Sequence, residues 1–324
     1  MSLVLRVAIA IAALAACDAA SAQYCTVDAF TIAFGTVNGI GQGDKATSGT
    51  VTVRCSGSST SWVRACIAIG APVDNSFDPR YMDGPRTPDL AYNIYSDSGY
   101  SQIWGSAFGT AGTQVPVDVY TPGGTGTATK TYYAKVPAQN SVAPGSYSRT
   151  FTPDPDTAVR NVGFNVGPGP ACQGSWGIAS RFNLSVNATV VTDCGVSAGT
   201  LNFGSVGIGL ATAAVNATST ISVTCSNTVP YTVAIGAGQG SGATVAQRKL
   251  TRSAGGTQTL LYRLYRDSGR TLLWGDGTSG TSTLAGTGAG IQSPSVLTVY
   301  GTLSAQAVPP AGTYNDQVIV TVTY

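Results

Sequence analysis

Residues 183–190 read Asn-Leu-Ser-Val-Asn-Ala-Thr-Val, an alternation of polar and apolar side chains. Successive side chains of a β-strand point to opposite faces, so this period of two predicts a strand with one buried face. Residues 49–53, 219–223 and 318–324 alternate in the same way. No stretch shows a convincing helical period of apolar residues. The sequence therefore predicts an all-β protein.

The two halves of the chain repeat one pattern of residues. The matching pairs are Cys25 and Cys194, Phe34-Gly35 and Phe203-Gly204, Cys55 and Cys225, Asp97 and Asp267, Trp104 and Trp274, Gln139 and Gln306, and Tyr147 and Tyr314. Their separation stays between 167 and 170 residues, which indicates a duplicated domain. Short strands with regular turns predict two tandem immunoglobulin-like antiparallel β-sandwiches, at residues 23–191 and 192–324.

The first 22 residues have the pattern of an export signal. Arg6 precedes an apolar run at residues 7–16, and Ala20-Ser21-Ala22 provides the small residues of a cleavage site. A second interpretation stays open, because residues 14–17 also fit a lipoprotein box in which Cys17 would be acylated.

Six cysteines remain after Cys17, and an even number in an exported chain predicts three disulfides. The repeat pairs Cys25 with Cys55 and Cys194 with Cys225, so that each bond ties the first strand of a domain to the second. Cys66 and Cys172 are left as an additional bond of the first half.

The composition argues against an enzyme. The chain has no histidine, which excludes histidine-dependent catalysis and histidine-ligated metals. Asp154 and Asp156 form the only close carboxylate pair with an unusual context, and the flanking prolines favour a stiff turn over a catalytic or calcium site. A net charge of +2 without basic clusters predicts no nucleic-acid partner. We expect no cofactor and no metal.

The order of these motifs resembles the spore coat protein U domain. Each repeat has an early Cys, a Phe-Gly, a second Cys about thirty residues later, an Asp-Ser-Gly turn and a Trp-Gly, and the second half closes with Pro-x-Gly-Thr-Tyr at residues 310–314. The resemblance covers nearly all of the chain after the signal, and the second half fits better. Two-domain relatives of this kind resemble the tip adhesin of archaic, Csu-type chaperone–usher pili.

This resemblance implies a function and a set of partners. The N-terminal domain would attach to an abiotic or host surface and promote biofilm formation, and the C-terminal domain would join the pilus shaft. A periplasmic chaperone, an outer-membrane usher and a neighbouring subunit that donates a strand would be the protein partners. The chain would pass through the periplasm to the cell surface and stay at the pilus tip.

The residues favour a terminal subunit independently of this resemblance. A shaft subunit donates an N-terminal extension of roughly 10 residues and accepts one from its neighbour. Cys25 lies three positions into the predicted mature chain, so we expect no extension to donate. The C-terminal half ends on an alternating strand, and a chaperone or donor strand is expected to contact Val318, Val320, Val322 and Tyr324. The simpler alternative, that this domain is short but complete, stays open.

The closing strand of the first half has two interpretations. Residues 182–191 would either close the first sandwich themselves or form the second part of a strand that begins at Tyr147. We prefer the first, because an unpaired edge at the tip would invite aggregation.

Surface contact is predicted for apolar residues of three segments that are prominent in the first half. Residues 152–180 form an insertion, expected to project from the far pole, and residues 75–90 and 106–112 are loops with aromatic side chains. The candidate contact residues are Phe77, Tyr81, Met82, Phe108, Val159, Val162, Phe164 and Val166. The alternative that Val162, Phe164 and Val166 alternate because they form a packed strand stays open.

Two other classes of function remain. A carbohydrate-binding domain could stack sugars on Trp62 or Trp176, whereas Trp104 has a counterpart in Trp274 that favours core packing. A protective coat protein is suggested only by the family's name, and it would need neither an incomplete domain nor a chaperone.

Overall fold

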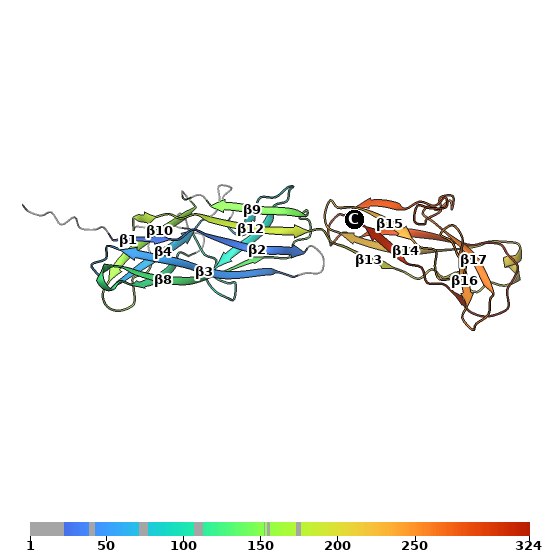
Figure 1. Ribbon diagram of the computed structural model, residues 1–324, viewed down its shortest axis with the longest axis horizontal. Coiled ribbons are helices and arrows are strands. Elements are labelled where there is room, and N and C mark those ends of the chain that lie inside the picture. The colour runs from blue at the N-terminus through green and yellow to red at the C-terminus, as the bar shows by residue number, and fades with distance from the viewer. Residues whose placement is uncertain are drawn as a thin grey trace, which may run out of the picture.

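The computed structural model describes residues 23–38, 43–70, 77–106, 113–151, 153, 156–172 and 176–324. The predicted signal peptide with Cys17, and the candidates Phe108 and Asp154, lie outside these residues. The chain forms two elongated all-β halves placed end to end (Figure 1). Within the described part, no helix is long and apolar enough to cross a membrane.

The described residues of the first half form twelve strands. They are β1 (Tyr24–Val27), β2 (Phe30–Asn38), β3 (Lys45–Ser56), β4 (Trp62–Ile69), β5 (Arg80–Met82), β6 (Leu90–Tyr95), β7 (Val115–Tyr120), β8 (Gly126–Val136), β9 (Gly145–Phe151), β10 (Thr157–Phe164), β11 (Ile178–Ser180) and β12 (Leu184–Val191). Their orders in the sheets are β1-β3-β8-β6-β5, β11-β10-β4-β7 and β2-β12-β9. A 3₁₀ turn, Pro122–Gly124, lies between β7 and β8.

The second half repeats this plan with fewer strands. They are β13 (Cys194–Ala198), β14 (Val215–Cys225), β15 (Pro230–Ile235), β16 (Arg248–Arg252), β17 (Thr259–Tyr265), β18 (Leu284–Thr287), β19 (Ser295–Leu303), β20 (Tyr314–Asn315) and β21 (Val320–Thr323), with a 3₁₀ turn at Ile208–Ala211. Their orders are β13-β14-β19-β17-β16-β20 and β18-β15-β21.

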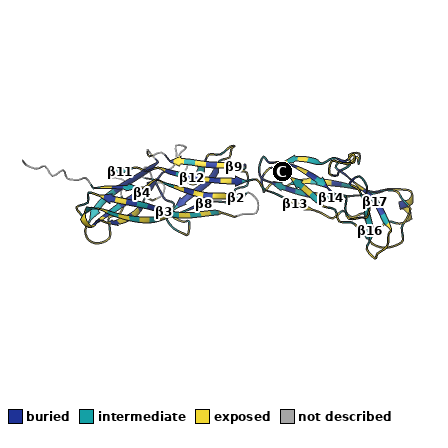
Figure 2. Cartoon of the chain, in the orientation of Figure 1, coloured by how far each residue is buried: buried dark blue, intermediate teal, exposed yellow. Residues whose placement is uncertain are grey.

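Each half has its own apolar core between its sheets (Figure 2). The period of two is visible along β7, where Val115, Val117 and Val119 are buried and the residues between them are exposed. The three predicted disulfides are confirmed as Cys25–Cys55, Cys66–Cys172 and Cys194–Cys225. The first and third connect directly paired residues of β1 with β3 and of β13 with β14.

The repeated tryptophans are core residues in both halves. Trp104 and Trp274 are fully buried. The indole Nε1 of Trp104 donates to the carbonyl of Ile67 at 3.0 Å, and that of Trp274 donates to Val233 at the same distance. Core packing therefore accounts for both residues, and neither is available for stacking on a sugar.

A buried arginine accompanies each tryptophan, and its role is not apparent from the sequence. The Nη2 atom of Arg80 donates to the carbonyls of Ile69 and Trp104. Arg248 makes the equivalent bonds to the carbonyls of Ile235 and Trp274. Burial disfavours the charged guanidinium and lowers the pKa of Arg80 to about 10. Both arginines thus provide hydrogen-bond donors to buried backbone carbonyl groups in the core.

The strand β12 closes the first half by itself, as preferred from the sequence. It lies between β2, to which it is parallel, and β9, to which it is antiparallel. Its inward residues Leu184, Val186, Ala188 and Val190 are all buried. The strand that contains Tyr147, β9, ends at Phe151, and the next strand along the chain is β10, which pairs with β4.

The expectation that residues 152–180 project as one loop is wrong for residues 157–164 and 178–180. Residues 157–164 are the strand β10, paired along its whole length with β4, and residues 178–180 form β11 against β10. The pairing of Thr157 of β10 with Ile69 corresponds to the pairing of Val320 of β21 with Ile235 in the second half. The apolar alternation of this segment is thus the pattern of a sheet strand, and residues 165–177 alone connect the two strands.

Candidate functional site

The second half has an open groove at the place that β12 fills in the first half. There, β12 lies between β2 and β9. The repeat places residues 199–206 at the position of β2 and residues 312–318 at that of β9. Within the described residues of the second half, no strand lies between these two segments. The predicted absence of the last strand is thereby confirmed in the arrangement of the sheets.

The groove has a volume of about 580 Å³. Its walls are residues 200–206 and 308–316, and Leu250, Leu260 and Leu303 lie between them. Equivalent core positions show what the missing strand would cover. Those of the first half are at most 3% exposed, whereas those of the second half are only partly buried. The equivalent pairs are Ile32 and Leu201, Phe34 and Phe203, Tyr147 and Tyr314, and Phe151 and Val318.

The repeated Phe-Gly motif forms a bulge that accommodates the closing strand. Asn187 pairs with Ala33 and Thr189 pairs with Thr36, so that Phe34 and Gly35 together face Ala188. Gly35 has a φ of +66°, a value that other residues rarely adopt, and Gly204 has a φ of +72°. The Oδ1 atom of Asn202 accepts a bond from the Gly204 amide at 2.8 Å. The bulge of the second half is therefore already formed without a partner strand.

One wall of the groove carries a carboxylate. Asp316 accepts hydrogen bonds from the hydroxyl of Tyr262 and the amide of Gln239, both at 2.7 Å. Burial and this bond to a carboxylate raise the pKa of Tyr262 well above its ordinary value. The tyrosine therefore stays protonated and fixes Asp316 against the core.

The residues predicted for chaperone or donor contact extend from this groove. Val318 is equivalent to Phe151, which pairs with Leu184 of β12. Val320 and Val322 belong to β21, an edge strand that pairs with β15 on one side only. In the first half, β11 covers the matching edge of β10. Sequence reasoning missed residues 200–206 and 308–316, although the repeated Phe-Gly and Pro-x-Gly-Thr-Tyr motifs lie within them.

A row of three aromatic side chains marks the opposite end of the molecule. Trp62 pairs across the strands with Tyr120 on one side and with Phe164 on the other. The ring of Trp62 lies 4.9 Å from that of Tyr120 and 6.4 Å from that of Phe164. Trp62 is 37% and Tyr120 is 54% exposed, and Val166 just beyond the row is 90% exposed. We call Trp62, Tyr120, Phe164 and Val166 the distal patch.

The direction of the strands places the distal patch far from the second half. The strand β12 runs toward the second half, so the antiparallel β9 runs away from it, and β10 continues in that direction to Phe164 (Figure 1). Beside Tyr120 lies a shallow hollow of about 360 Å³ lined by Ser58 to Ser61 and by residues 120–124. This pole thus combines aromatic rings with hydroxyl groups.

Two hydrogen bonds and a disulfide hold the segment after Phe164 against the sheet. The guanidinium of Arg64 donates to the carboxylate of Asp118 at 2.7 Å and to the carbonyls of Gly169 and Pro170. The carboxylate raises the pKa of Arg64, so its charge persists. The disulfide from Cys172 to the fully buried Cys66 anchors the same segment.

The predicted contact residues are divided between different places. Phe164 and the half-buried Val162 lie at the distal end of β10, and Val166 follows it two residues after the strand ends. Met82 and Val159 are fully buried, so the expectation that they contact a surface is wrong. Phe77 packs beneath the Arg80 guanidinium at 4.4 Å. Sequence reasoning left Trp62 open and missed Tyr120, whose exposed position follows from the alternation along β7.

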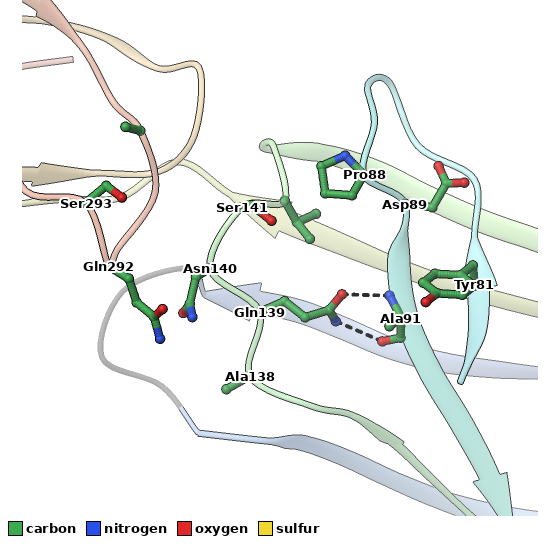
Figure 3. A pocket seen from close by; sticks show the side chains of 12 residues that line it. Tyr81, Pro88, Asp89, Ala91, Ala138, Gln139, Asn140, Ser141, Gln292 and Ser293 are labelled. Carbon is green, nitrogen blue, oxygen red and sulfur yellow. Dashed lines mark hydrogen bonds between the residues drawn. The ribbon is translucent and has the colours of Figure 1, made fainter. Parts of the chain in front are cut away.

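Tyr81 lies at the junction of the two halves (Figure 3). It lines a hollow of about 510 Å³ with Asn140 and Ser141 of the first half and Gln292 and Ser293 of the second. The Gln139 amide exchanges two hydrogen bonds with the backbone of Ala91, at 2.8 and 2.9 Å. Gln306 exchanges the same pair of bonds with Leu261, which explains the repeated glutamine. Tyr81 therefore lies at the end of the first half that faces the second half, away from the distal patch.

The described residues contain no group of three or more His, Cys, Asp or Glu side chains arranged to hold a metal ion. Asp97 and Asp267 accept bonds from the backbone of their own turns, including Gln102 and Leu272 at 2.7 and 2.8 Å. These carboxylates have a local structural role.

Comparison with known proteins agrees with this architecture. The model of the Spore Coat Protein U domain matches residues 10–153 and 180–321. Protein U of Myxococcus xanthus is 37% identical over 154 residues, which are 44% of this chain and 83% of that protein.

A solved structure shares the fold. A chain of the CsuC–CsuE chaperone–tip subunit pre-assembly complex from the archaic chaperone–usher Csu pili of Acinetobacter baumannii matches with a TM-score of 0.50 and 18% identity, over 93% of this chain and 100% of that one. The CupB6 tip adhesin of Pseudomonas aeruginosa matches with a TM-score of 0.36 and 11% identity, over 93% and 94% of the two chains.

Proposed function

The chain belongs to the Spore Coat Protein U domain family, and we propose that it is the tip adhesin subunit of a chaperone–usher pilus. In this role the second half, residues 192–324, joins the fibre, and the first half, residues 23–191, attaches to a surface. Both halves act through binding, and the proposal assigns no catalytic residue.

The open groove of the second half supports this proposal most strongly. Two copies of one fold lie in the same chain, and only the first contains its closing strand among the described residues. The half-exposed core residues of the second copy and its unpaired backbone suit the addition of a strand from another protein. A free-standing coat protein has no need for such a groove.

The same groove suits two successive partners. A periplasmic chaperone would pair with residues 312–318 and with the β21 edge, covering Val318, Val320, Val322 and Tyr324 before assembly. The usher would then export this subunit first, and a strand of the neighbouring shaft subunit would replace the chaperone. Export through the periplasm is compatible with the three disulfides.

Attachment is assigned to the distal patch. Exposed aromatic and aliphatic side chains at a rigid pole bury apolar area on contact with an abiotic or host surface. The patch lies at the end of the molecule opposite the groove, so it faces outward when the second half joins a fibre. Adherent cells linked in this way would form a biofilm.

The assembly role is tested by co-purification from the periplasm. The full chain is expressed with the immunoglobulin-like chaperone of its own pilus system. We expect a stoichiometric complex with the native chain and loss of the complex with Leu201→Arg or Tyr314→Arg. The matched control is Val296→Arg, at a side chain of β19 that is 64% exposed and lies outside the groove. Unchanged complexes with both groove variants would contradict the proposal.

The adhesive role is tested with polystyrene beads, which are either coated with the purified full chain or used bare to capture it. Trp62→Ala and Tyr120→Ala should each weaken bead binding by about fivefold or more, since exposed aromatic anchors dominate contact energies. Ile208→Ala is the control, because Ile208 is 88% exposed but lies in the second half. Equal losses for all three variants would contradict a role specific to the distal patch.

Carbohydrate binding is a second candidate, favoured by the hydroxyl-lined hollow beside Tyr120. Sugars stack on aromatic faces while their hydroxyls bond to polar groups, and both features occur at this pole. Inhibition of bead or cell attachment by soluble cello- or chito-oligosaccharides would favour this candidate. Attachment that ignores these sugars and weakens in mild detergent would favour apolar contact.

A further inference from the structure

We infer that the hollow at the junction of the two halves is a binding site for a neutral saccharide of one or two sugar units. The hollow has a volume of about 510 Å³, which lies within the range of small-molecule sites, and such sites occur preferentially at domain interfaces. Its lining includes no residue of the groove in the second half and none of the distal patch. The inference therefore goes beyond the proposed function, and its test is separate.

Side chains from both halves surround the hollow with polar groups (Figure 3). Tyr81, Asp89 and Asn140 belong to the first half, and Gln292 and Ser293 belong to the second. Within the described part of the chain, no hydrogen bond or ion pair involves the side chains of Asp89, Asn140, Gln292 or Ser293. Two carboxamides, a carboxylate and a hydroxyl are therefore available to a ligand at one place.

The wall from the first half is fixed on both sides of Asn140. Before it, the side chain of Gln139 exchanges two hydrogen bonds with the backbone of Ala91. After Ser141, Val142 and Ala143 are buried in the first half. The loop that carries Asn140 thus has a set conformation, which lowers the cost of ordering it around a ligand.

The wall from the second half is fixed by its backbone. The amide of Gly288 donates to the carbonyl of Val229 at 2.8 Å, and the amide of Gly290 donates to the carbonyl of Cys225 at 3.2 Å. Cys225 is itself tied to Cys194 by a disulfide. The segment before Gln292 and Ser293 is thus anchored to the end of β14.

Two contacts hold the two walls against each other. The carboxamide of Asn227 donates to the carbonyl of Ser141. Gly290, with a φ of +92°, lies so close to the first half that an added Cβ atom would be 2.0 Å from the carbonyl oxygen of Asn140. Both contacts involve backbone carbonyl groups of the first half, so they do not engage the side chain of Asn140.

The repeat shows that this loop does not need a polar side chain in order to fold. Gln139 and Gln306 are equivalent and make the same pair of backbone bonds. The next residue is Asn140 in the first half and Ala307 in the second. The loop therefore forms with either side chain, and the carboxamide of Asn140 is left for recognition.

The polar groups of the hollow suit the hydroxyls of a sugar. A carboxamide donates and accepts hydrogen bonds and a carboxylate accepts them, while a sugar hydroxyl does both. The ring of the half-buried Tyr81 and the neighbouring Pro88 offer apolar surface to the C–H face of a sugar ring.

Charge favours a neutral ligand over an ionic one. Asp89 is the one charged side chain among the described residues that line the hollow. Its carboxylate repels an anionic ligand, and a single carboxylate at a partly exposed position attracts a cation only weakly. A neutral ligand with several hydroxyl groups uses all of the polar groups present.

The test uses the full chain with a panel of neutral probes, namely glucose, galactose, mannose, N-acetylglucosamine, cellobiose, lactose and chitobiose. Binding is measured by saturation-transfer NMR, and the thermal transitions of both halves are measured by calorimetry. We expect at least one probe to bind with a Kd on the order of 1 mM, as suits a small ligand in an open hollow. Because the ligand contacts both halves, it should raise both transitions.

Variants of the lining locate the binding site. Asn140→Ala and Gln292→Ala should each weaken binding by about threefold to tenfold, because each removes hydrogen bonds to the sugar. The matched control is Gln258→Ala, at an exposed residue of the second half outside the hollow, which should leave binding unchanged. Thermal transitions without sugar show that each variant is folded.

The charge of Asp89 gives a second prediction. Glucuronic acid should bind to the native chain more weakly than glucose does, and Asp89→Asn should reduce this difference, because the substitution removes the repulsion. Equal discrimination by the native and Asp89→Asn chains would contradict the placement of the sugar beside this carboxylate.

Three further results would overturn the inference. The first is the absence of binding by every probe in the panel, and the second is binding that persists unchanged in the Asn140→Ala and Gln292→Ala chains. The third is binding that raises only the first transition and is lost in a Tyr120→Ala chain, which would place the sugar at the distal pole. None of these results bears on whether the groove of the second half accepts a strand.

Discussion

Ala188 lies directly opposite Tyr147 in the first half, whereas the equivalent Tyr314 has no residue of the described chain opposite it on the groove side. Tyr147 is 1% exposed and Tyr314 is partly exposed. This difference in exposure arises from the presence or absence of one strand, because the local setting is the same. The hydroxyl of each tyrosine donates to the carbonyl of the residue four positions earlier. The duplicated chain thus shows one fold with and without its closing strand.

Overpacking at Ala188 should destabilise the first half alone. The Ala188→Leu variant introduces three heavy atoms between Phe34 and Tyr147, and we expect a loss of about 1–3 kcal/mol in the free energy of unfolding. Urea unfolding of the full chain, monitored by tryptophan fluorescence, measures the change. The control is Thr189→Leu, whose side chain faces outward in the same strand. Equal losses for both variants would show that the position is not size-limited.

Arg64 should hold the distal patch in place. The Arg64→Met variant keeps much of the side-chain volume but removes the bonds to Asp118, Gly169 and Pro170, so we expect a loss of about 1–3 kcal/mol and weaker bead binding. The control is Arg54→Met, which breaks an exposed ion pair with Asp28 and should cost about 0–1 kcal/mol. Bead binding that survives Arg64→Met would show that the patch needs no such support.

The disulfide between Cys66 and Cys172 should stabilise the first half and the segment before Cys172. It closes a chain separation of 106 residues, and its removal by a double Cys→Ser change should cost about 2–5 kcal/mol. Limited proteolysis should then cut within residues 165–172. The control is the double change at Cys194 and Cys225, which should lower only the second transition. Protection of residues 165–172 after loss of the bond would contradict an anchoring role.

The repeated turn aspartates predict an acid-dependent loss of stability. Backbone amides, led by that of Leu272, lower the pKa of Asp267 below 3.8, and those of the first turn, led by Gln102, lower that of Asp97. A folded-state pKa below the unfolded one contributes stability that is complete above the unfolded value and is lost as pH falls through the folded one. In Asp97→Asn and Asp267→Asn chains, the difference from the native chain should therefore shrink below pH 3.8. If the difference in stability between the native and variant chains stayed constant with pH, these two carboxylates would not be the source of the acid-dependent loss.

Local patterns predict much of this fold because they are repeated. The alternation along residues 183–190, the duplicated cysteines and the paired tryptophans identify strands, disulfides and core from the sequence alone. The contact residues were harder to predict, because an apolar side chain in a strand faces the core or the solvent according to its register. Val159 and Phe164 lie in one strand, yet Val159 is buried and Phe164 reaches the distal patch.

The other site residues were missed in the sequence because they come together only through pairing between distant segments. Trp62, Tyr120 and Phe164 are far apart in sequence and meet only because β7, β4 and β10 are adjacent in register. The walls of the groove, likewise, come from two segments about 100 residues apart. No local signal shows that residues 200–206 lack a partner, and the comparison with β2 in the first half is what identifies them.

Amide hydrogen exchange at residues 312–318 tests the central claim most directly. The exchange rates are measured in the free full chain and in the same chain within purified fibres, with the equivalent residues 145–151 as the internal reference. We expect rapid exchange in the free chain and, in fibres, protection close to that of residues 145–151, because a donated strand then occupies the groove. Equal protection of residues 312–318 in both states would contradict an account in which this half is completed by another subunit.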